Sequence, residues 1–95
     1  MLTNIITAAV TAYIWTGYRC ADNHWPKEGV SVAVPRSIPL GSTVIINGHT
    51  YLAQDHTSLK YDGRFDIYMG HNYKKAVEWG NQTLIVTIYE KEDKK

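Results

Sequence analysis

The chain has 95 residues, of which 44% are hydrophobic and 12% aromatic, and its formal net charge at pH 7 is +1. This length fits one domain, 1–95, and the apolar content suffices for a compact core, which excludes a globally disordered chain. The small net charge gives no electrostatic case for a nucleic-acid partner or an anionic membrane surface. We therefore expect a small globular domain whose function depends on individual side chains.

An apolar run covers residues 5–15 near the start of the chain. It is too short to span a bilayer as a helix, threonines interrupt it, and no Lys or Arg precedes it, so it does not read as a secretory signal peptide. We predict a core strand, no export signal and no membrane insertion. The two alternating faces of this strand are Ile6, Ala8, Val10, Ala12 and Ile14 on one side, and Thr7, Ala9, Thr11, Tyr13 and Trp15 on the other.

Further strands are predicted by short β-rich runs between turn residues. Asn47-Gly48 lies between two such runs and predicts a hairpin, because a type I′ turn needs positive φ at both central residues. Pro35 and Pro39 exclude a central strand in the stretch that they frame. The predicted strands after the first are 30–34, 43–47, 49–54, 65–69 and 83–89, with loops over 16–29 and 56–63. In the last of these strands, Leu84, Val86 and Ile88 are expected to share one apolar face.

One helix is predicted over 71–79, where Asn72 can cap the start and Gly80 can end the helix in a left-handed conformation. Six short strands with one helix before the last favour a small closed β-barrel, since closure removes exposed strand edges. The alternating charges of 90–95 predict a frayed, solvated tail. The helical spacing gives the predicted apolar face as Tyr73, Ala76 and Val77.

Two aspartates stand in or beside predicted strands: Asp55 ends one strand, and Asp66 lies in the next, 11 residues later. A carboxylate in an apolar strand is costly to bury unless it is hydrogen bonded or used. Asp66 and Tyr68 share one face of their strand, opposite three apolar residues, so we expect Asp66 to face a cleft or solvent. Two interpretations stay open here: a shared catalytic site, or aspartates that brace turns.

The remaining candidate groups carry weaker signals. Cys20 is the only cysteine and has no clear base, so a buried structural thiol is favoured over a nucleophile. The four histidines show no metal-ligand spacing, and neither a metal nor a cofactor is expected; His56 stands beside Asp55 and can act as its partner. No P-loop, Rossmann glycine pattern or G-x-S-x-G occurs. Aromatic residues in or beside loops suit sugar rings as well as ordinary packing: Trp15, Tyr18, Trp25 and Tyr61.

Several short motifs occur in a recognisable order over residues 5–89: Thr11-Ala12-Tyr13, Val32-Ala33-Val34-Pro35, Ile38-Pro39-Leu40-Gly41-Ser42-Thr43-Val44, Ile46-Asn47-Gly48, Gln54-Asp55, Gly63-Arg64-Phe65-Asp66-Ile67-Tyr68 and Ala76-Val77-Glu78-Trp79-Gly80. In this order the chain resembles the 3D domain, a family named for three aspartates that includes the barrel of MltA-type peptidoglycan lytic transglycosylases. The resemblance implies an all-β fold with one short helix, a six-stranded double-psi β-barrel, which agrees with the strand count above.

The sequence departs from the family pattern in three places. The family's first aspartate commonly follows Ala-Val in an A-V-D-P motif, whereas here Val34 is followed directly by Pro35, and Asp22 is the substitute that we consider. Asp55-His56-Thr57 lacks the glycine of the family's D-T-G motif, and the Ile-Lys-Gly stretch appears as 59–63. These changes concern the site and leave the predicted barrel intact.

The resemblance implies cleavage of the glycosidic bond between N-acetylmuramic acid and N-acetylglucosamine, with formation of 1,6-anhydromuramic ends. It implies two catalytic residues: Asp66 as the acid/base and Asp55 beside it in the same groove. We expect burial and the charge of Asp55 to raise the pKa of Asp66. The expected substrate-binding residues are Thr11, Tyr13, Lys60 and Tyr68.

The alternative function is a non-catalytic barrel that binds cell-wall glycan or serves as a structural part of a phage virion. For either function the expected partner is the peptidoglycan glycan strand, bound by a monomer at the bacterial cell wall. Since no signal peptide is predicted, two routes fit this place of action: delivery as a phage or prophage product, or a cytoplasmic location until release. Release of soluble glycan products distinguishes the enzyme from the binding module.

Overall fold

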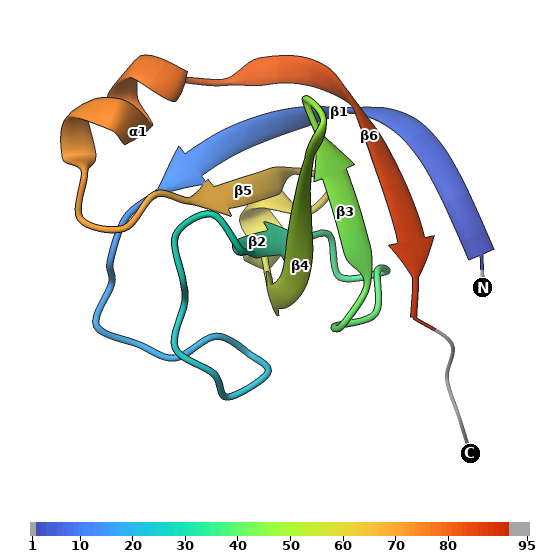
Figure 1. Ribbon diagram of the computed structural model, residues 1–95, viewed down its shortest axis with the longest axis horizontal. Helices are drawn as coiled ribbons and strands as arrows, with labels where there is room; N and C mark the ends of the chain where they lie inside the picture. Colours follow the sequence, from blue (N-terminus) through green and yellow to red (C-terminus); the bar gives the residue numbers. More distant parts are fainter. Residues whose placement is uncertain (1, 92–95) are drawn as a thin grey trace.

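The computed structural model describes residues 2–91. Its elements in chain order are β1 (Leu2–Tyr13), β2 (Ser31–Val34), β3 (Thr43–Ile46), β4 (His49–His56), the 3-10 helix η1 (Leu59–Tyr61), β5 (Phe65–Tyr68), α1 (Tyr73–Trp79) and β6 (Gln82–Glu90). The strands form a closed barrel in the order β1-β5-β2-β4-β3-β6 (Figure 1). The predicted all-β fold with one short helix is confirmed.

Four connections between consecutive strands pass over another strand of the barrel, and two of them interlock: β1 to β2 and β4 to β5. β5 lies between β1 and β2, and β2 lies between β4 and β5. These interlocked crossings make up the double-psi arrangement that the family resemblance implies. The β1–β5 and β2–β4 pairs are parallel, and the other four pairs are antiparallel.

The long strand β1 pairs with β6 on one edge and with β5 on the other. Its pairing with β6 begins at Leu2, opposite Glu90, and reaches Val10, so the two strands lie side by side across the molecule (Figure 1). On its other edge, its last four residues, from Val10 to Tyr13, pair with β5, so Val10 pairs with both neighbouring strands. The strand therefore begins and ends earlier than the predicted 5–15, because cross-strand pairing and not hydropathy sets its bounds.

Alternating apolar side chains fill the barrel interior. In β6, Val86 and Ile88 are buried as predicted, while Ile85, which precedes Val86 and lies on the opposite face, is exposed. In β2, by contrast, all four residues are buried, as expected of a short strand in the middle of a closed sheet. The core consists of Ala8, Val10, Val32, Val34, Ile38, Val44, Ile46, Ala53, Phe65, Ile67, Met69, Val86 and Ile88.

The predicted hairpin and helix caps are present. Asn47 and Gly48 have φ of 52° and 75°, the positive values of a type I′ turn between β3 and β4. Asn72 caps α1, since its side-chain oxygen accepts a hydrogen bond from the Lys75 N–H at 3.0 Å. Gly80 ends α1 with φ 67° and ψ −135°, so φ is positive but the conformation is not left-handed helical.

The predicted apolar face of α1 was wrong. Tyr73 and Val77 are 68% and 58% exposed, whereas Ala76 and Trp79 pack against the barrel core. The Trp79 indole N–H donates to the Val10 carbonyl at 3.0 Å, and this bond orients the helix on β1. No helix in residues 2–91 is long and apolar enough to cross a membrane. Of the predicted C-terminal tail, 92–95 lie outside the described residues.

Candidate functional site

Four residues lie in one row across four adjacent strands. Thr11 in β1 pairs with Asp66 in β5, Asp66 pairs with Ala33 in β2, and Ala33 pairs with Asp55 in β4. Directly paired residues project from the same face of a sheet. The fold therefore brings both aspartates to one face, with the small side chain of Ala33 between them.

A β-bulge in β4 orients the side chain of Asp55 toward this face. The β2–β4 register pairs Val32 with Ala53 and then Ala33 with Asp55, so Gln54 is an extra residue in β4. Without such a bulge Asp55 would pair one residue further along β2, and its side chain would turn to the other face. Gln54 is buried and stabilised by hydrogen bonds to Ser31 and Asp22.

Both aspartates line one pocket of about 390 Å³, called here the Asp66 groove. Thr11 and Tyr13, two of the predicted substrate-binding residues, also line it, whereas Lys60 and Tyr68 do not. The full lining is Thr11, Ala12, Tyr13, Ala33, Asp55, His56, Thr57, Ser58, Tyr61, Arg64 and Asp66.

The Asp66 carboxyl group is half-buried in this groove. The Thr11 hydroxyl donates a hydrogen bond to Asp66 Oδ1 at 3.0 Å. Burial raises the pKa of Asp66 above its ordinary value, while the Thr11 hydrogen bond and the Arg64 charge act in the opposite direction. The charge of Asp55 is not a cause of this shift, so that part of the expectation was wrong. Two strand spacings, about 10 Å, separate the backbones of the two aspartates.

The Asp55 carboxyl group has different surroundings. Its Oδ1 accepts hydrogen bonds from the backbone N–H groups of Ala21, at 3.1 Å, and His56, at 2.9 Å. Ala21 belongs to the long β1–β2 loop, so Asp55 fastens that loop to β4. Asp22, considered above as a substitute for the family's first aspartate, does not line the groove; it bonds to Gln54 and to the His24 backbone instead.

Tyr13 lies close to both aspartates in the groove. Burial raises the pKa of the Tyr13 hydroxyl, and the charges of Cys20, Asp55 and Asp66 add to the effect. The Tyr68 ring packs on the Tyr13 ring with centroids 5.3 Å apart. Tyr68 thus supports Tyr13 and does not itself line the groove.

Lys60 is an exposed residue of η1 next to Tyr61, which lines the groove, and its ammonium group lies 5.4 Å from the Tyr61 ring centroid. The same ring stacks with the Arg64 guanidinium at 4.6 Å. Arg64 is a groove residue that the sequence analysis did not identify, although its position two residues before Asp66 on an extended chain was a usable signal. Ala33, Thr57 and Ser58 were missed as well, and no sequence signal marked them.

Thr57 and Cys20 are buried near the groove. The Thr57 hydroxyl has no hydrogen-bond partner in the described part of the chain. Cys20 is a free, buried thiol whose pKa is raised to about 11, by burial first and then by the charges of Asp55 and Asp22. The structure thus favours a structural role for Cys20, as predicted.

His56 contacts Asp55 through its backbone, while its ring Nε2 donates to the Ile38 carbonyl at 2.9 Å. His56 is therefore a partner of Asp55 through its backbone N–H, while its ring is hydrogen bonded elsewhere. Among residues 2–91, no three His, Cys, Asp or Glu side chains gather in a way that could hold a metal ion.

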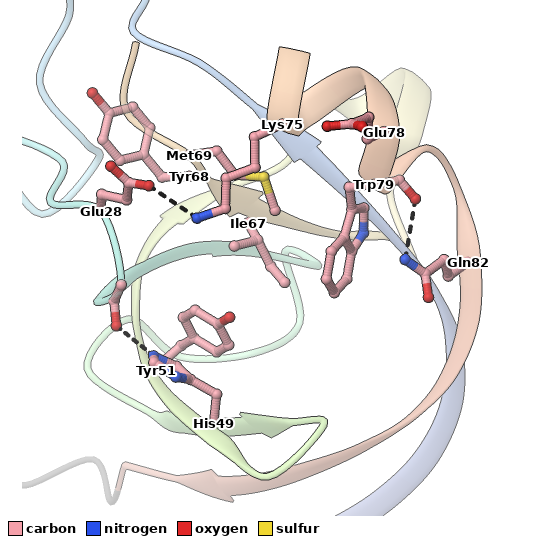
Figure 2. Close-up of a pocket in the computed structure, with 11 residues that line it drawn as sticks. Glu28, His49, Tyr51, Ile67, Tyr68, Met69, Lys75, Glu78, Trp79 and Gln82 are labelled. Atoms are coloured by element: carbon pink, nitrogen blue, oxygen red, sulfur yellow. Dashed lines mark hydrogen bonds and ion pairs between the residues drawn. The ribbon is translucent and has the colours of Figure 1, made fainter. Parts of the chain in front are cut away.

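A larger pocket of about 650 Å³ lies between α1 and the start of β4 (Figure 2). Ile67 and Tyr68 of β5 line it together with Met69, which follows the strand, and the rings of Tyr51 and Trp79 project into it (Figure 2). Lys75 reaches across to Glu28 at 3.2 Å. Size alone favours this pocket, but the half-buried carboxyl group with a raised pKa is in the Asp66 groove, which we take as the candidate active site.

Comparisons with known proteins agree with this fold. Residues 30–90 match the sequence model of the 3D domain. Among solved structures, an apo form of a variant of the E. coli lytic transglycosylase MltA matches with a TM-score of 0.61 and 22% identity over 82% of this chain. A crystal structure of MltA from E. coli matches with a TM-score of 0.60 and 23% identity over 81% of this chain. The chain spans 29% of each of these structures. No curated protein gave a significant match.

Proposed function

Because this chain belongs to the 3D domain family, we propose that it cleaves peptidoglycan glycan strands as a lytic transglycosylase, with Asp66 as the acid/base group. The observation that carries the proposal is the Asp66 carboxyl group, half-buried in a groove with its pKa raised. The fold shared with MltA, which is named a lytic transglycosylase, supports the reaction class. Since the chain spans only 29% of that protein, the activity needs its own test.

The reaction begins with Asp66 in its protonated form. The carboxyl group donates its proton to the glycosidic oxygen, the bond from that oxygen to C1 of the muramic acid breaks, and the N-acetylglucosamine leaves with a new hydroxyl group. Asp66 is now a carboxylate, and it removes the proton from the C6 hydroxyl of the same muramic acid. The C6 oxygen then bonds to C1, which closes the 1,6-anhydro ring without water and returns the proton to Asp66.

This cycle needs one carboxyl group that is stable in both protonation states. A free Asp titrates near ~3.9, and burial raises the pKa of Asp66 so that the group keeps its proton to higher pH. The Thr11 hydroxyl and the Arg64 charge favour the ionised form that follows proton donation. A second carboxylate nucleophile is unnecessary, unlike in hydrolysis with two carboxylates.

The other predicted site residues take supporting parts in this proposal. Tyr13, packed on Tyr68, presents its hydroxyl group to the sugar beside Asp66. Lys60, next to the groove residue Tyr61, binds the lactyl or peptide carboxylates of the substrate in this proposal. Asp55 acts as a positioning residue, since two backbone N–H groups already hold its Oδ1.

A specific observation favours the alternative, a barrel that binds the glycan without cutting it. Val34, which precedes Pro35 where the family commonly has its first aspartate, is fully buried in the core. The groove therefore carries two of the family's three aspartates, and one of these, Asp55, is held by backbone hydrogen bonds.

Digestion of purified sacculi distinguishes the two functions. Wild-type protein should release soluble muropeptides, and Asp66→Asn should lose at least about 100-fold in rate, because general acid–base catalysis contributes 10²–10⁴-fold. Asp62→Asn is the matched control, since an Asn side chain can still accept the Arg36 N–H that Asp62 holds at 2.9 Å. Asp66→Asn with wild-type activity would reject the role of Asp66. Wild-type protein that binds sacculi without releasing product would favour the binding module.

A further inference from the structure

Two exposed tryptophans, Trp15 and Trp25, form an aromatic cluster that the Asp66 groove does not include. Their ring centroids are 5.5 Å apart, and the His71 ring lies 5.8 Å from Trp15. Trp15 is 38% exposed and Trp25 is 52% exposed. The Arg19 guanidinium stacks over the Trp25 ring at 4.7 Å. A contiguous patch of exposed apolar rings is a mark of a binding surface.

Along the chain, Trp15 of this cluster comes shortly after the β1 residues that line the groove. Thr11 contacts Asp66, Tyr13 lines the groove, and Trp15 follows two residues later, with a Cα at most about 7 Å from that of Tyr13. The backbone of this segment is fixed beside the end of β5. Tyr13 accepts a hydrogen bond from the Met69 N–H at 2.8 Å, and the Trp15 N–H donates to Gly70 at 2.8 Å. The segment that leads from Thr11, the partner of Asp66, to Trp15 is therefore short, and backbone hydrogen bonds fix its position.

The loop that carries Arg19 and Trp25 is anchored on the other side of the groove. Asp55 accepts the Ala21 N–H at 3.1 Å, and the Asp22 N–H donates to the Gln54 carbonyl at 3.1 Å. Both anchors are in β4, next to the groove. Because these bonds pre-order the loop, a ligand that binds the cluster has less ordering to impose on it.

We propose that Trp15 and Trp25 bind one pyranose ring of the glycan strand whose scissile bond lies at Asp66. This inference rests on the proposed function and names a further subsite for the same substrate. Pyranose rings present apolar C–H faces that match flat aromatic rings, and Arg19 supplies a cation for the carboxylates of muramic acid. The two tryptophans and Arg19 lie before residue 30, where the match to the family model begins.

The test uses Asp66→Asn as the parent protein, so that the ligand stays intact. Soluble β-1,4-linked N-acetylglucosamine oligomers of increasing length are titrated by calorimetry or by NMR. Affinity for the parent should rise when the oligomer becomes long enough to reach the tryptophans. Adding Trp25→Ala should remove this gain, a loss on the order of tenfold or about 1.4 kcal/mol for long oligomers, with little effect on the disaccharide. Trp25→Phe should restore part of it.

Tyr73→Ala is the matched control, since Tyr73 is an aromatic residue 68% exposed on α1. The proposal is overturned if Trp25→Ala binds all lengths like the parent, if Tyr73→Ala loses as much affinity, or if the parent binds no oligomer. Failure of the proposed function gives a different result: the wild type would cut no glycan, while the length-dependent loss in Trp25→Ala would remain.

Discussion

Asp55 and Asp66 pair in register with the same residue, Ala33, from the two strands that flank β2. They face one groove, but their carboxyl groups have different surroundings. Burial raises the pKa of Asp66, whereas backbone N–H groups hold the Asp55 carboxylate in place. We therefore assign proton transfer to Asp66 and positioning to Asp55, and the predictions below test this division.

Replacing Asp66 by Asn should stabilise the barrel at neutral pH. The pKa of Asp66 is raised in the folded state, so its contribution to stability is fully present below the unfolded pKa, about 3.9, and is lost as pH rises through the folded pKa. Asn keeps an acceptor for Thr11 and cannot ionise. Calorimetric Tm values should therefore show an advantage of Asp66→Asn over wild type that grows from about pH 3 to about pH 7. A constant or shrinking advantage would contradict the burial of this carboxyl group.

Thr11→Val should shift the high-pH limb of the pH–activity profile to higher pH. The Thr11 hydrogen bond lowers the pKa of Asp66, so its removal lets the acid keep its proton to higher pH. The rate of muropeptide release from sacculi, measured across pH, checks this. Thr11→Ser retains the hydroxyl group and should leave the limb in place. A limb that stays fixed in Thr11→Val would show that another group controls it.

Removal of the Asp55 carboxylate should loosen the β1–β2 loop. Asp55→Ala leaves the Ala21 N–H without its protein acceptor; because Ala21 is exposed, water can take the place of that acceptor, and the expected cost is about 0.5–1.5 kcal/mol in unfolding free energy. Denaturant unfolding and limited proteolysis within 16–29 measure both effects. Asp55→Asn keeps an oxygen acceptor and should remain within about tenfold of wild-type activity, since it retains Asp66. A folded Asp55→Asn that loses activity about 100-fold or more would make Asp55 an acid/base group itself.

Cys20 should be inert in the folded protein. Its thiol is buried and its pKa is raised to about 11, so little thiolate is present at neutral pH. A chromogenic disulfide reagent should react slowly with native protein and fast after denaturation, and Cys20→Ala should retain activity. Fast labelling of native protein, or an inactive but folded Cys20→Ala, would point to a functional thiol.

Local signals explain which parts of the fold the sequence predicted. The Asn47-Gly48 turn and the alternation of β6 depend on near neighbours in the chain, and both are confirmed. The face of α1 depends on which side meets the barrel, so Tyr73 and Val77 were misassigned to the apolar face. The pairing that starts β1 at Leu2 is set by β6, more than eighty residues away, and no local pattern reveals it.

The candidate site was predicted to a similar extent. The alternation of β5 correctly placed Asp66 away from the core. The contribution of Ala33 and the bulge at Gln54 arise only when β2 lies between β4 and β5, so the sequence did not reveal them. Because the sequence did not reveal that β2 separates β4 from β5, the rise in the pKa of Asp66 was attributed in part to the charge of Asp55. Two strand spacings separate the backbones of these residues, and Asp55 is not among the causes of the shift.

The masses of the muropeptides that the wild-type protein releases from purified sacculi test the central claim most directly. One buried carboxyl group that both gives and takes the proton predicts anhydro ends, each one water lighter than a hydrolysed end, and their loss in Asp66→Asn. Reducing ends of full hydrated mass would mean that water attacks C1, and would contradict a mechanism built on Asp66 alone.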